Sequence, residues 1–296
     1  MTLAIRQLRK TFDGATAVDG LTFEVEPGRA FALLGGNGAG KTTTIRMILG
    51  LFPPDSGEIA WQGGPVRRDR VRIGYLPEER GLYPKARVLD QLVYLGRLQG
   101  MANRAAGQAA RAWLERLGLA ECARRRAEEL SKGNQQKIQL IAALISDPDL
   151  VILDEPFSGL DPVNAELLKD VVLELTKRGR TLIFSSHQME HVESLCEDIV
   201  LLKKGRVALQ GNLAAIKRSY GRTNLRVQAD ADVGPLLQRP GVLSVRRLAA
   251  GYEVKLAEEG AAQSILRALA DADAPVVRYE LAEPSLHEIF IEKVGG

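Results

Sequence analysis

The clearest chemical signal in the chain is a glycine-rich run that ends in a lysine and two threonines. It fits the pattern G-x-x-x-x-G-K-[ST] and lies between an apolar run at 31–34 and apolar residues at helical spacing over 44–49. Glycines let a backbone close around phosphates with its N–H groups pointing inward. We expect Lys41 to reach the terminal phosphates and the Thr42 hydroxyl to bind Mg²⁺. The loop consists of Gly35, Gly36, Asn37, Gly38, Ala39, Gly40, Lys41, Thr42 and Thr43.

A second signal combines a Ser-x-Gly turn with a strand that ends in two acids. Ser131 and Gly133 stand where a helix should begin, and the free N–H groups of a helix start favour a phosphate. The apolar run 150–153 then leads into Asp154 and Glu155. Taken alone, the serine could be a helix cap and the acids a solvated strand end. Their occurrence together with the glycine-rich loop favours a nucleotide site.

Composition limits the classes of protein that remain. A chain of 296 residues can form one large core and a smaller unit. The formal net charge of +3 is too small to indicate nucleic acid by itself. Cys122 and Cys196 lie far apart without metal-ligand spacing, as in a reducing cytoplasm. No apolar run approaches the roughly 18 residues of a membrane helix, and no signal peptide opens the chain. We therefore expect a soluble chain that leaves any membrane spanning to another chain.

The order of elements predicts an α/β protein with two domains. Short apolar runs alternate with helical stretches up to Arg222, and between 88 and 143 the pattern becomes helical, which predicts an inserted helical subdomain. From 223 to 296 the pattern changes to β-α-β-β-α-β, which predicts a ferredoxin-like accessory domain. The predicted strands of the first domain are 3–6, 21–25, 31–34, 150–153, 181–185 and 199–202.

With these motifs in place, the chain resembles the ATPase subunit of ABC transporters over about residues 2 to 211. The loop 35–43 matches the Walker A motif, 130–134 the ABC signature and 150–154 Walker B. The resemblance implies a P-loop NTPase core with an antiparallel β-subdomain and the helical subdomain, plus a small α+β C-terminal domain. The stretches 76–83 and 284–290 are similar to the branch that includes sodium-extrusion ATPases.

The resemblance also implies roles for single residues. Glu155 takes the place of the catalytic carboxylate, and His187 that of the switch histidine, so these two and Lys41 are the expected catalytic residues. Asp154, Thr42 and Glu78 are the expected Mg²⁺ ligands. The residues implied in ATP binding outside the loop, some from the second subunit of a head-to-tail homodimer or heterodimer, are Phe12, Glu78, Ser131, Gly133, Asn134 and Asp161.

The sequence departs from the family pattern at several positions. Gly36 stands where the family usually has proline. Phe12 stands where it usually has a tyrosine that stacks on adenine, and stacking needs only the ring face and not the hydroxyl. Glu78 replaces a glutamine, so it can still ligate Mg²⁺ but adds repulsion toward a γ-phosphate. Lys132 and Asn134 replace the glycine and glutamine of the signature. Lys132 either adds charge near the phosphate or points to solvent, and the frequency of surface lysines favours solvent.

These observations predict an ATPase, with ATP and Mg²⁺ as cofactors, that energises a separate integral-membrane permease at the cytoplasmic face of the membrane. An exporter of sodium ions, drugs or lipids is the leading hypothesis, without nucleic acid as a partner. The alternative is a soluble ABC ATPase that acts on ribosomes or nucleic acid. Such proteins usually carry two cassettes or a long coiled coil, and this sequence has one cassette and no heptad run. The signature and the acid pair argue against a nucleotide kinase.

Overall fold

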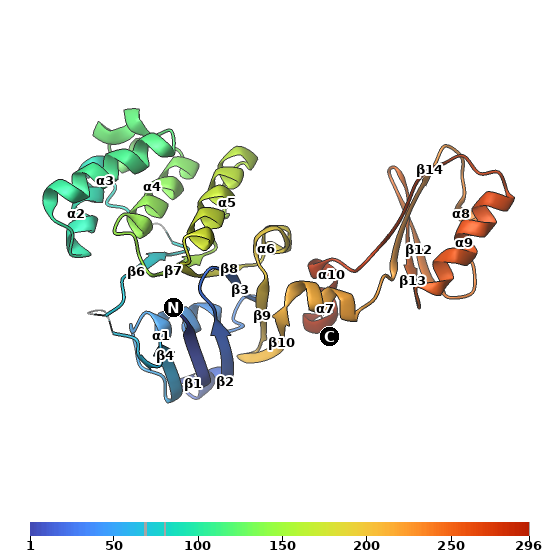
Figure 1. Ribbon diagram of the computed structural model, residues 1–296, viewed down its shortest axis with the longest axis horizontal. Coiled ribbons are helices and arrows are strands. Elements are labelled where there is room, and N and C mark those ends of the chain that lie inside the picture. The colour runs from blue at the N-terminus through green and yellow to red at the C-terminus, as the bar shows by residue number, and fades with distance from the viewer. Residues whose placement is uncertain (68–69, 80, 296) are drawn as a thin grey trace. The chain divides into compact units, whose positions relative to one another are not determined.

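The computed structural model describes residues 1–67, 70–79 and 81–295 (Figure 1). Arg80 and Gly296, which belong to the predicted stretches 76–83 and 223–296, lie outside the described residues. The chain forms two compact units, Met1–Gln210 and Gly211–Gly296.

A mainly parallel sheet organises the first unit. Among the described residues it has six strands in the order β10-β9-β3-β8-β7-β6, and every pair from β9 to β6 is parallel. Because parallel strands point the same way, their carboxyl ends meet at one edge of the sheet. The strands are β3 (Ala30–Gly35), β6 (Ile73–Leu76), β7 (Leu150–Asp154), β8 (Thr181–Ser186), β9 (Asp198–Lys203) and β10 (Arg206–Asn212).

The register of this sheet sets which residues meet at the carboxyl edge. Leu34 of β3 pairs with Ser186 of β8, and Asp154 of β7 pairs with Ser185. All residues of β3, β7 and β8 are buried, as their uninterrupted apolar runs predict. The ends of three strands that are distant in sequence thus lie side by side.

An antiparallel sheet with the order β2-β1-β4-β5 makes up the β-subdomain. The hairpin between β1 and β2 turns at Asp13 and Gly14, whose φ angles of 46° and 82° suit the tight turn that asparagine, aspartate and glycine favour. The strands are β1 (Leu3–Phe12), β2 (Ala15–Val25), β4 (Ser56–Trp61) and β5 (Gly64–Pro65). One hydrophobic core joins the two sheets, and Ile45 and Ile48 of the helix α1 (Lys41–Ile48) belong to it.

The helical subdomain lies where the sequence predicts it. It consists of α2 (Val88–Leu98), α3 (Asn103–Arg116), the short 3₁₀ turns η1 (Ala120–Arg124) and η2 (Ala127–Glu129), and α4 (Lys132–Leu144). The helices α5 (Pro162–Lys177) and α6 (Met189–Leu195) follow β7 and β8. The P-loop NTPase fold, with its antiparallel β-subdomain and its helical insertion, is thereby confirmed.

The second unit contains the predicted β-α-β-β-α-β order within an antiparallel sheet, β12-β13-β11-β14. Its division from the first unit falls after Gln210, whereas the sequence predicts it after Arg222. The second unit therefore includes α7, which leads into Tyr220; the Tyr220 hydroxyl donates a hydrogen bond of 3.3 Å to Oε1 of Glu292 on α10. The elements are α7 (Leu213–Ser219), β11 (Asn224–Ala229), α8 (Gly234–Leu237), β12 (Val242–Leu248), β13 (Gly251–Leu256), α9 (Gly260–Asp271), β14 (Val276–Ala282) and α10 (Leu286–Val294).

Gly74 offers a test of how closely the helical subdomain is seated on the parallel sheet. A Cβ at Gly74 of β6 would lie 2.2 Å from the backbone oxygen of Ala143 on α4. Gly74→Ala should therefore lower the free energy of unfolding by roughly 1–3 kcal/mol, as overpacking does. Gly107→Ala on α3, where the nearest atom is 4.0 Å from the Cβ position, is the control. Thermal melts that rank Gly74→Ala equal to Gly107→Ala would contradict this account of the packing.

Candidate nucleotide site

The loop after β3 closes around the side chain of Lys41. This side chain is buried, and its Nζ donates hydrogen bonds to the backbone oxygens of Gly35 at 2.7 Å and Gly36 at 3.3 Å. The helix α1 begins at Lys41, and no side chain within the described ranges caps it. Its first N–H groups and its dipole therefore form an anion site with a buried ammonium group beside it.

Glycine is required at two positions of the loop because neighbouring backbone approaches closely. A Cβ at Gly35 would lie 2.7 Å from the oxygen of Leu202, and a Cβ at Gly40 would lie 2.6 Å from the oxygen of Ala17. At Gly36, where the family has proline, no atom lies within 4 Å of the Cβ position. The departure at Gly36 therefore has no steric consequence.

Acidic side chains converge at the carboxyl end of β7. Asp154 is buried, and its Oδ1 accepts a hydrogen bond from the Ser185 hydroxyl. Burial raises the pKa of Asp154, the Ser185 hydrogen bond opposes that rise, and the charges of Glu78 and Glu155 add to it. The nearby ammonium of Lys41 lowers the pKa. The structure thus brings Glu78, Asp154, Glu155 and Lys41 together, although they come from three separate stretches of the chain.

The donor set at this edge fits a hydrated Mg²⁺ bound largely through phosphate. Within residues 1–67, 70–79 and 81–295, no group of three or more His, Cys, Asp and Glu side chains is arranged to hold a metal by itself. Mg²⁺ usually keeps several waters and takes one or two carboxylates together with substrate phosphates. A cation beside Asp154 would also relieve the repulsion among the acids that raises its pKa.

Glu155 and His187 form a direct pair at the same edge. Oε2 of Glu155 lies 2.9 Å from Nδ1 of His187 and accepts a longer hydrogen bond, 3.4 Å, from the backbone N–H of His187. The Glu155 side chain is 7% exposed and that of His187 is 62% exposed. A buried carboxylate is therefore held by a histidine that solvent or a ligand can reach.

The backbone of Glu155 adopts an uncommon conformation. Its φ angle is 50°, in the left-handed region that a non-glycine residue rarely occupies. Its N–H donates to both the backbone oxygen and the hydroxyl of Ser185, each at 3.2 Å. Strand β8 thereby fixes the direction in which the chain leaves β7, and with it the position of the carboxylate.

The Ser-x-Gly turn lies next to the start of α5. Ser131 caps α4, because its Oγ accepts a hydrogen bond of 3.3 Å from the Asn134 N–H. A Cβ at Gly133 would lie 3.5 Å from Nδ2 of Asn164 and 4.0 Å from Oδ2 of Asp161, the residue that caps α5. The structure therefore brings Ser131, Gly133, Asn134 and Asp161 together as a second group.

This second group is not joined to the phosphate-binding loop of its own chain. In the part of the chain that the structure describes, no hydrogen bond or ion pair connects Ser131, Gly133 or Asn134 with residues 35–43. Figure 1 shows α4 and α1 on opposite sides of β6 and β7.

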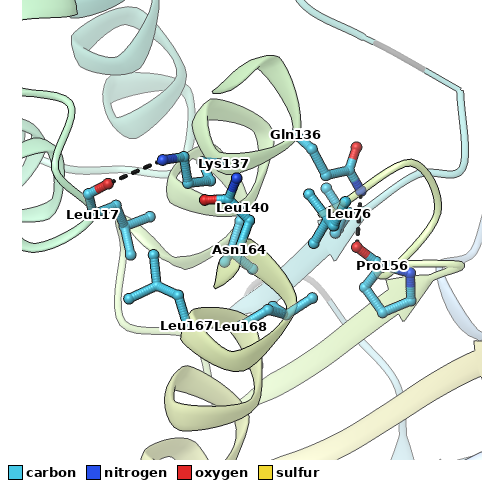
Figure 2. Close-up of a pocket in the computed structure, with 10 residues that line it drawn as sticks. Leu76, Leu117, Gln136, Lys137, Leu140, Pro156, Asn164, Leu167 and Leu168 are labelled. Atoms are coloured by element: carbon cyan, nitrogen blue, oxygen red, sulfur yellow. Dashed lines mark hydrogen bonds between the residues drawn. The ribbon is translucent and has the colours of Figure 1, made fainter. Parts of the chain in front are cut away.

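Two glutamines of α4 connect the helix to the acidic edge, and the sequence analysis did not single them out. The side-chain amide of Gln136 donates to the backbone oxygen of Pro156 at 3.3 Å, as Figure 2 shows, and that of Gln139 donates to the oxygen of Glu79 at 3.2 Å. Pro156 directly follows Glu155 in the sequence, and Glu79 directly follows Glu78. Both glutamines are buried, and a buried polar side chain inside an apolar helix face is the signal that could have identified them.

The pocket drawn in Figure 2 is a packing seam between α4, α5 and the end of β6. Its volume of about 10 Å³ is sufficient for about one water molecule. Lys137 closes one side by donating to the oxygen of Leu117 at 3.2 Å, and burial lowers the pKa of Lys137. The seam is too small to bind a nucleotide.

Phe12 lies at the end of β1 with 43% of its surface exposed. Its ring meets that of Phe52 edge to face at 5.4 Å, and Nζ of Lys10 lies 5.5 Å from its centroid. Phe12 pairs with Ala15 of β2. Two residues further along β2, the backbone oxygen of Ala17 lies close to Gly40 of the loop. Two strand residues span about 7 Å, so the ring is held near the phosphate-binding loop with surface left for stacking.

Comparisons with known proteins agree with this geometry. The ABC transporter family model matches residues 18–158. The ABC transporter ATP-binding protein YhaQ of Bacillus subtilis is 51% identical over 295 residues, with 99% of each chain covered. This chain belongs to the ATP-binding proteins of ABC transporters. Hydrolysis of ATP coupled to transport is the general function of this family, so the chain is an ATPase.

Other ABC relatives have more specific names. The Nod factor export ATP-binding protein I of Paraburkholderia xenovorans is 40% identical over 214 residues, with 71% of this chain and 70% of that protein covered. The linearmycin resistance ATP-binding protein of Bacillus subtilis is 31% identical over 310 residues, with 99% and 98% covered. The solved ATP-binding subunit of an ABC transporter is 30% identical with a TM-score of 0.69, covering 75% of this chain and 94% of that one.

The second unit has a family match of its own. Residues 211–294 match the C-terminal domain of DrrA1-3-like ATP-binding proteins. The start of this match at Gly211 coincides with the start of the second unit. The first relative, YhaQ, also extends over this unit, so the ABC cassette and the C-terminal domain occur together in both chains.

Gln136 allows the link between α4 and the acidic edge to be tested. Gln136→Leu leaves the Pro156 oxygen unpaired and loosens the segment after Glu155, so the rate of ATP hydrolysis should fall about tenfold. The affinity for a fluorescent ATP analogue should stay within about twofold, because the phosphate-binding loop is untouched. Gln108→Leu, at an exposed position of α3, is the matched control. Equal hydrolysis rates in the two variants would remove Gln136 from this positioning role.

Proposed function

We propose that this chain is the ATP-hydrolysing subunit of an exporter and works on a separate integral-membrane permease from the cytoplasmic face of the membrane. The observation that carries the proposal is the Glu155–His187 pair at the carboxyl edge, beside the loop that encloses Lys41. Export is supported by relatives whose names refer to export and to resistance. In the described ranges no helix is long and apolar enough to cross a membrane.

The phosphate-binding loop and the acidic edge would hold ATP together with Mg²⁺. Lys41 and the first N–H groups of α1 provide positive charge for the terminal phosphates. Thr42, Asp154 and Glu78 would hold the metal, directly or through water. When bound, Mg²⁺ neutralises charge on the β- and γ-phosphates. A cation at this edge would favour the ionised form of Asp154, whose pKa is raised by burial and by its acidic neighbours.

Glu155 is the residue that we assign to the attacking water. Its Oε2 lies 2.9 Å from Nδ1 of His187 and accepts a hydrogen bond from the His187 backbone N–H, which fixes the direction of the carboxylate. We assign the other oxygen, Oε1, to accept a proton from water. His187 is exposed on its other side and can contact the γ-phosphate. Loss of that phosphate then changes the partner of the histidine, which lets the site report hydrolysis to the rest of the subunit.

The Ser-x-Gly group supports a head-to-tail dimer. Ser131, Gly133 and Asn134 present a helix start that has no link to the loop of their own chain, and Asp161 lies beside them. In a homodimer or a heterodimer of ATPase subunits this turn would meet the γ-phosphate on the partner. Two ATP molecules would then be enclosed between the subunits, and a single subunit would hydrolyse ATP slowly.

A groove next to the site is suited to a helix of the permease. It has a volume of about 490 Å³ and is lined by the end of α1, by β6 and by the end of α2. Leu51 and Leu98 line it with 56% and 66% of their surface exposed, so a permease helix that covered them would bury apolar surface. Strand β6 leads to Glu78, so an occupant of the groove would act directly on the acidic edge.

Glu155→Gln tests the assigned chemistry. The substitution keeps the size of the side chain and removes the base, so hydrolysis should fall by roughly 10²-fold or more while ATP binding is retained. The purified variant should also accumulate as a dimer in ATP, which sedimentation measures. Turnover close to that of the unchanged protein would exclude Glu155 as the base.

Leu98→Asp tests the groove. A carboxylate in an apolar contact costs free energy of desolvation, so copurification of the tagged protein with its permease should fall at least tenfold. Leu173→Asp on α5 makes the same change at another exposed leucine, 41% exposed, and should not reduce copurification. Equal recovery of the permease by both variants would place its contact elsewhere.

A further inference from the structure

Strand β14 is an open edge of the C-terminal sheet. Within the described residues 211–295 it has a hydrogen-bonded neighbour, β11, on one side only. The N–H and C=O groups of its other side are therefore available for a further strand. Val276 and Val277 near its start are 37% and 58% exposed. An edge with exposed β-branched residues can accept another strand readily.

The sequence of β14 is self-complementary when two copies are paired antiparallel about Tyr279. If two copies of β14 pair antiparallel with their Tyr279 residues opposite, Arg278 of each copy lies opposite Glu280 of the other. In the same register Val277 lies opposite Leu281. Opposite charges and apolar pairs across two strands are each stabilising, whereas like charges are not. The arrangement satisfies both rules along the strand.

The open face of the sheet already carries an alternating row of charge that would continue across this contact. Arg246 of β12 is paired in register with Glu253 of β13, which is opposite Arg226 of β11. Arg226 in turn is opposite Glu280 of β14. The row therefore ends at the edge in a negative charge, and Arg278 from a second copy is the next positive charge.

Within one chain, the negative charge of Glu280 is already partly compensated. Its Oε2 forms an ion pair with Arg278 two residues earlier on the same face of β14. Both side chains are largely exposed, 58% for Arg278 and 41% for Glu280, so this pair contributes little in water. Exchanging it for the same pair between two copies costs little.

We propose that β14 pairs with β14 of a second copy of this chain, antiparallel and centred on Tyr279, to join the two C-terminal sheets into one. The contact is isologous and closes with two-fold symmetry, so it stops at a dimer. It uses neither the phosphate-binding loop nor the Ser-x-Gly turn, and it forms without nucleotide. It is a contact separate from the ATP-dependent one.

The other edge of the sheet is less suited to such pairing. Strand β12 carries Arg246 and Arg247 next to each other, and it has no acidic residue of its own. Two copies of β12 would bring these positive charges together, with no acidic residue on the facing strand to compensate them. A mixed contact of β14 with β12 would leave an edge open on each copy and propagate into fibres. The balanced charges of β14 therefore select its own copy as the partner.

One strand pair buries little surface, so the contact should be weak for free chains. Interfaces well below about 1,200 Å² are typical of transient contacts. When two copies are held on one transporter, the second contact becomes intramolecular, with an effective concentration near the millimolar range. The C-terminal unit would then keep two subunits associated after ATP has been hydrolysed.

Cysteine crosslinking of the full chain tests the register. Arg278→Cys chains mixed with Glu280→Cys chains, without nucleotide and under mild oxidation, should form a disulfide dimer, because directly opposite Cβ atoms lie roughly 4.5–5.5 Å apart. Arg278→Cys alone should crosslink much less, because diagonal neighbours are roughly 7–8 Å apart. The native Cys122 and Cys196 are buried, and the single-variant sample reports any contribution from them. Equal crosslinking in the mixture and in the single variant, or none in either, would overturn the proposal.

Sedimentation at high protein concentration without nucleotide tests the charges. Arg278→Glu places glutamates opposite each other at two positions of the pair and should weaken the dimer about tenfold. Arg247→Glu makes the same charge change on β12 and should leave the dimer unchanged. Thermal melts confirm that both variants fold. A nucleotide-free dimer that tolerates Arg278→Glu as well as Arg247→Glu would contradict β14 pairing, whereas loss of ATP-dependent dimers alone would concern only the proposed ATPase cycle.

Discussion

The parallel register of β3, β8 and β7 is the constraint on which the nucleotide site depends. It places Ser185 beside Asp154 and brings the loop after β3 to the same edge. Ser185 then acts on both acids, because its hydroxyl donates to Asp154 while its hydroxyl and backbone oxygens accept from the Glu155 N–H. A shift of one residue between β7 and β8 would separate all of these groups at once.

Without a ligand, the negative charge at this edge is only partly balanced. Glu78, Asp154 and Glu155 lie near the buried ammonium of Lys41, and the pKa of Asp154 is raised as a result of burial and of its acidic neighbours. A site in this condition gains from any cation that enters, and the gain depends on phosphates arriving with it. The replacement of glutamine by Glu78 increases this dependence, because it adds a negative charge where the family has a neutral amide.

Local motifs were the part of the structure that the sequence could predict. The loop 35–43 and the acids after β7 belong to short segments whose spacing decides their conformation, and the family and fold predicted from them are confirmed. Gln136 was missed because its contact with Pro156 depends on how α4 packs against β7. The second unit includes α7, which the sequence pattern assigns to the cassette because a helix after β10 continues the alternation of strands and helices. The roles of the individual site residues stay predictions.

The left-handed backbone at Glu155 links the chemistry of the chain to its stability. A non-glycine residue in this conformation costs about 1–2 kcal/mol, whereas glycine and asparagine adopt it more easily. With the role proposed for Glu155, the position holds a residue that suits the reaction and not the fold. A descendant of this chain that no longer needed to hydrolyse ATP could gain thermal stability by exchanging this one glutamate for asparagine. Loss of activity and gain of robustness would then occur in the same mutational step.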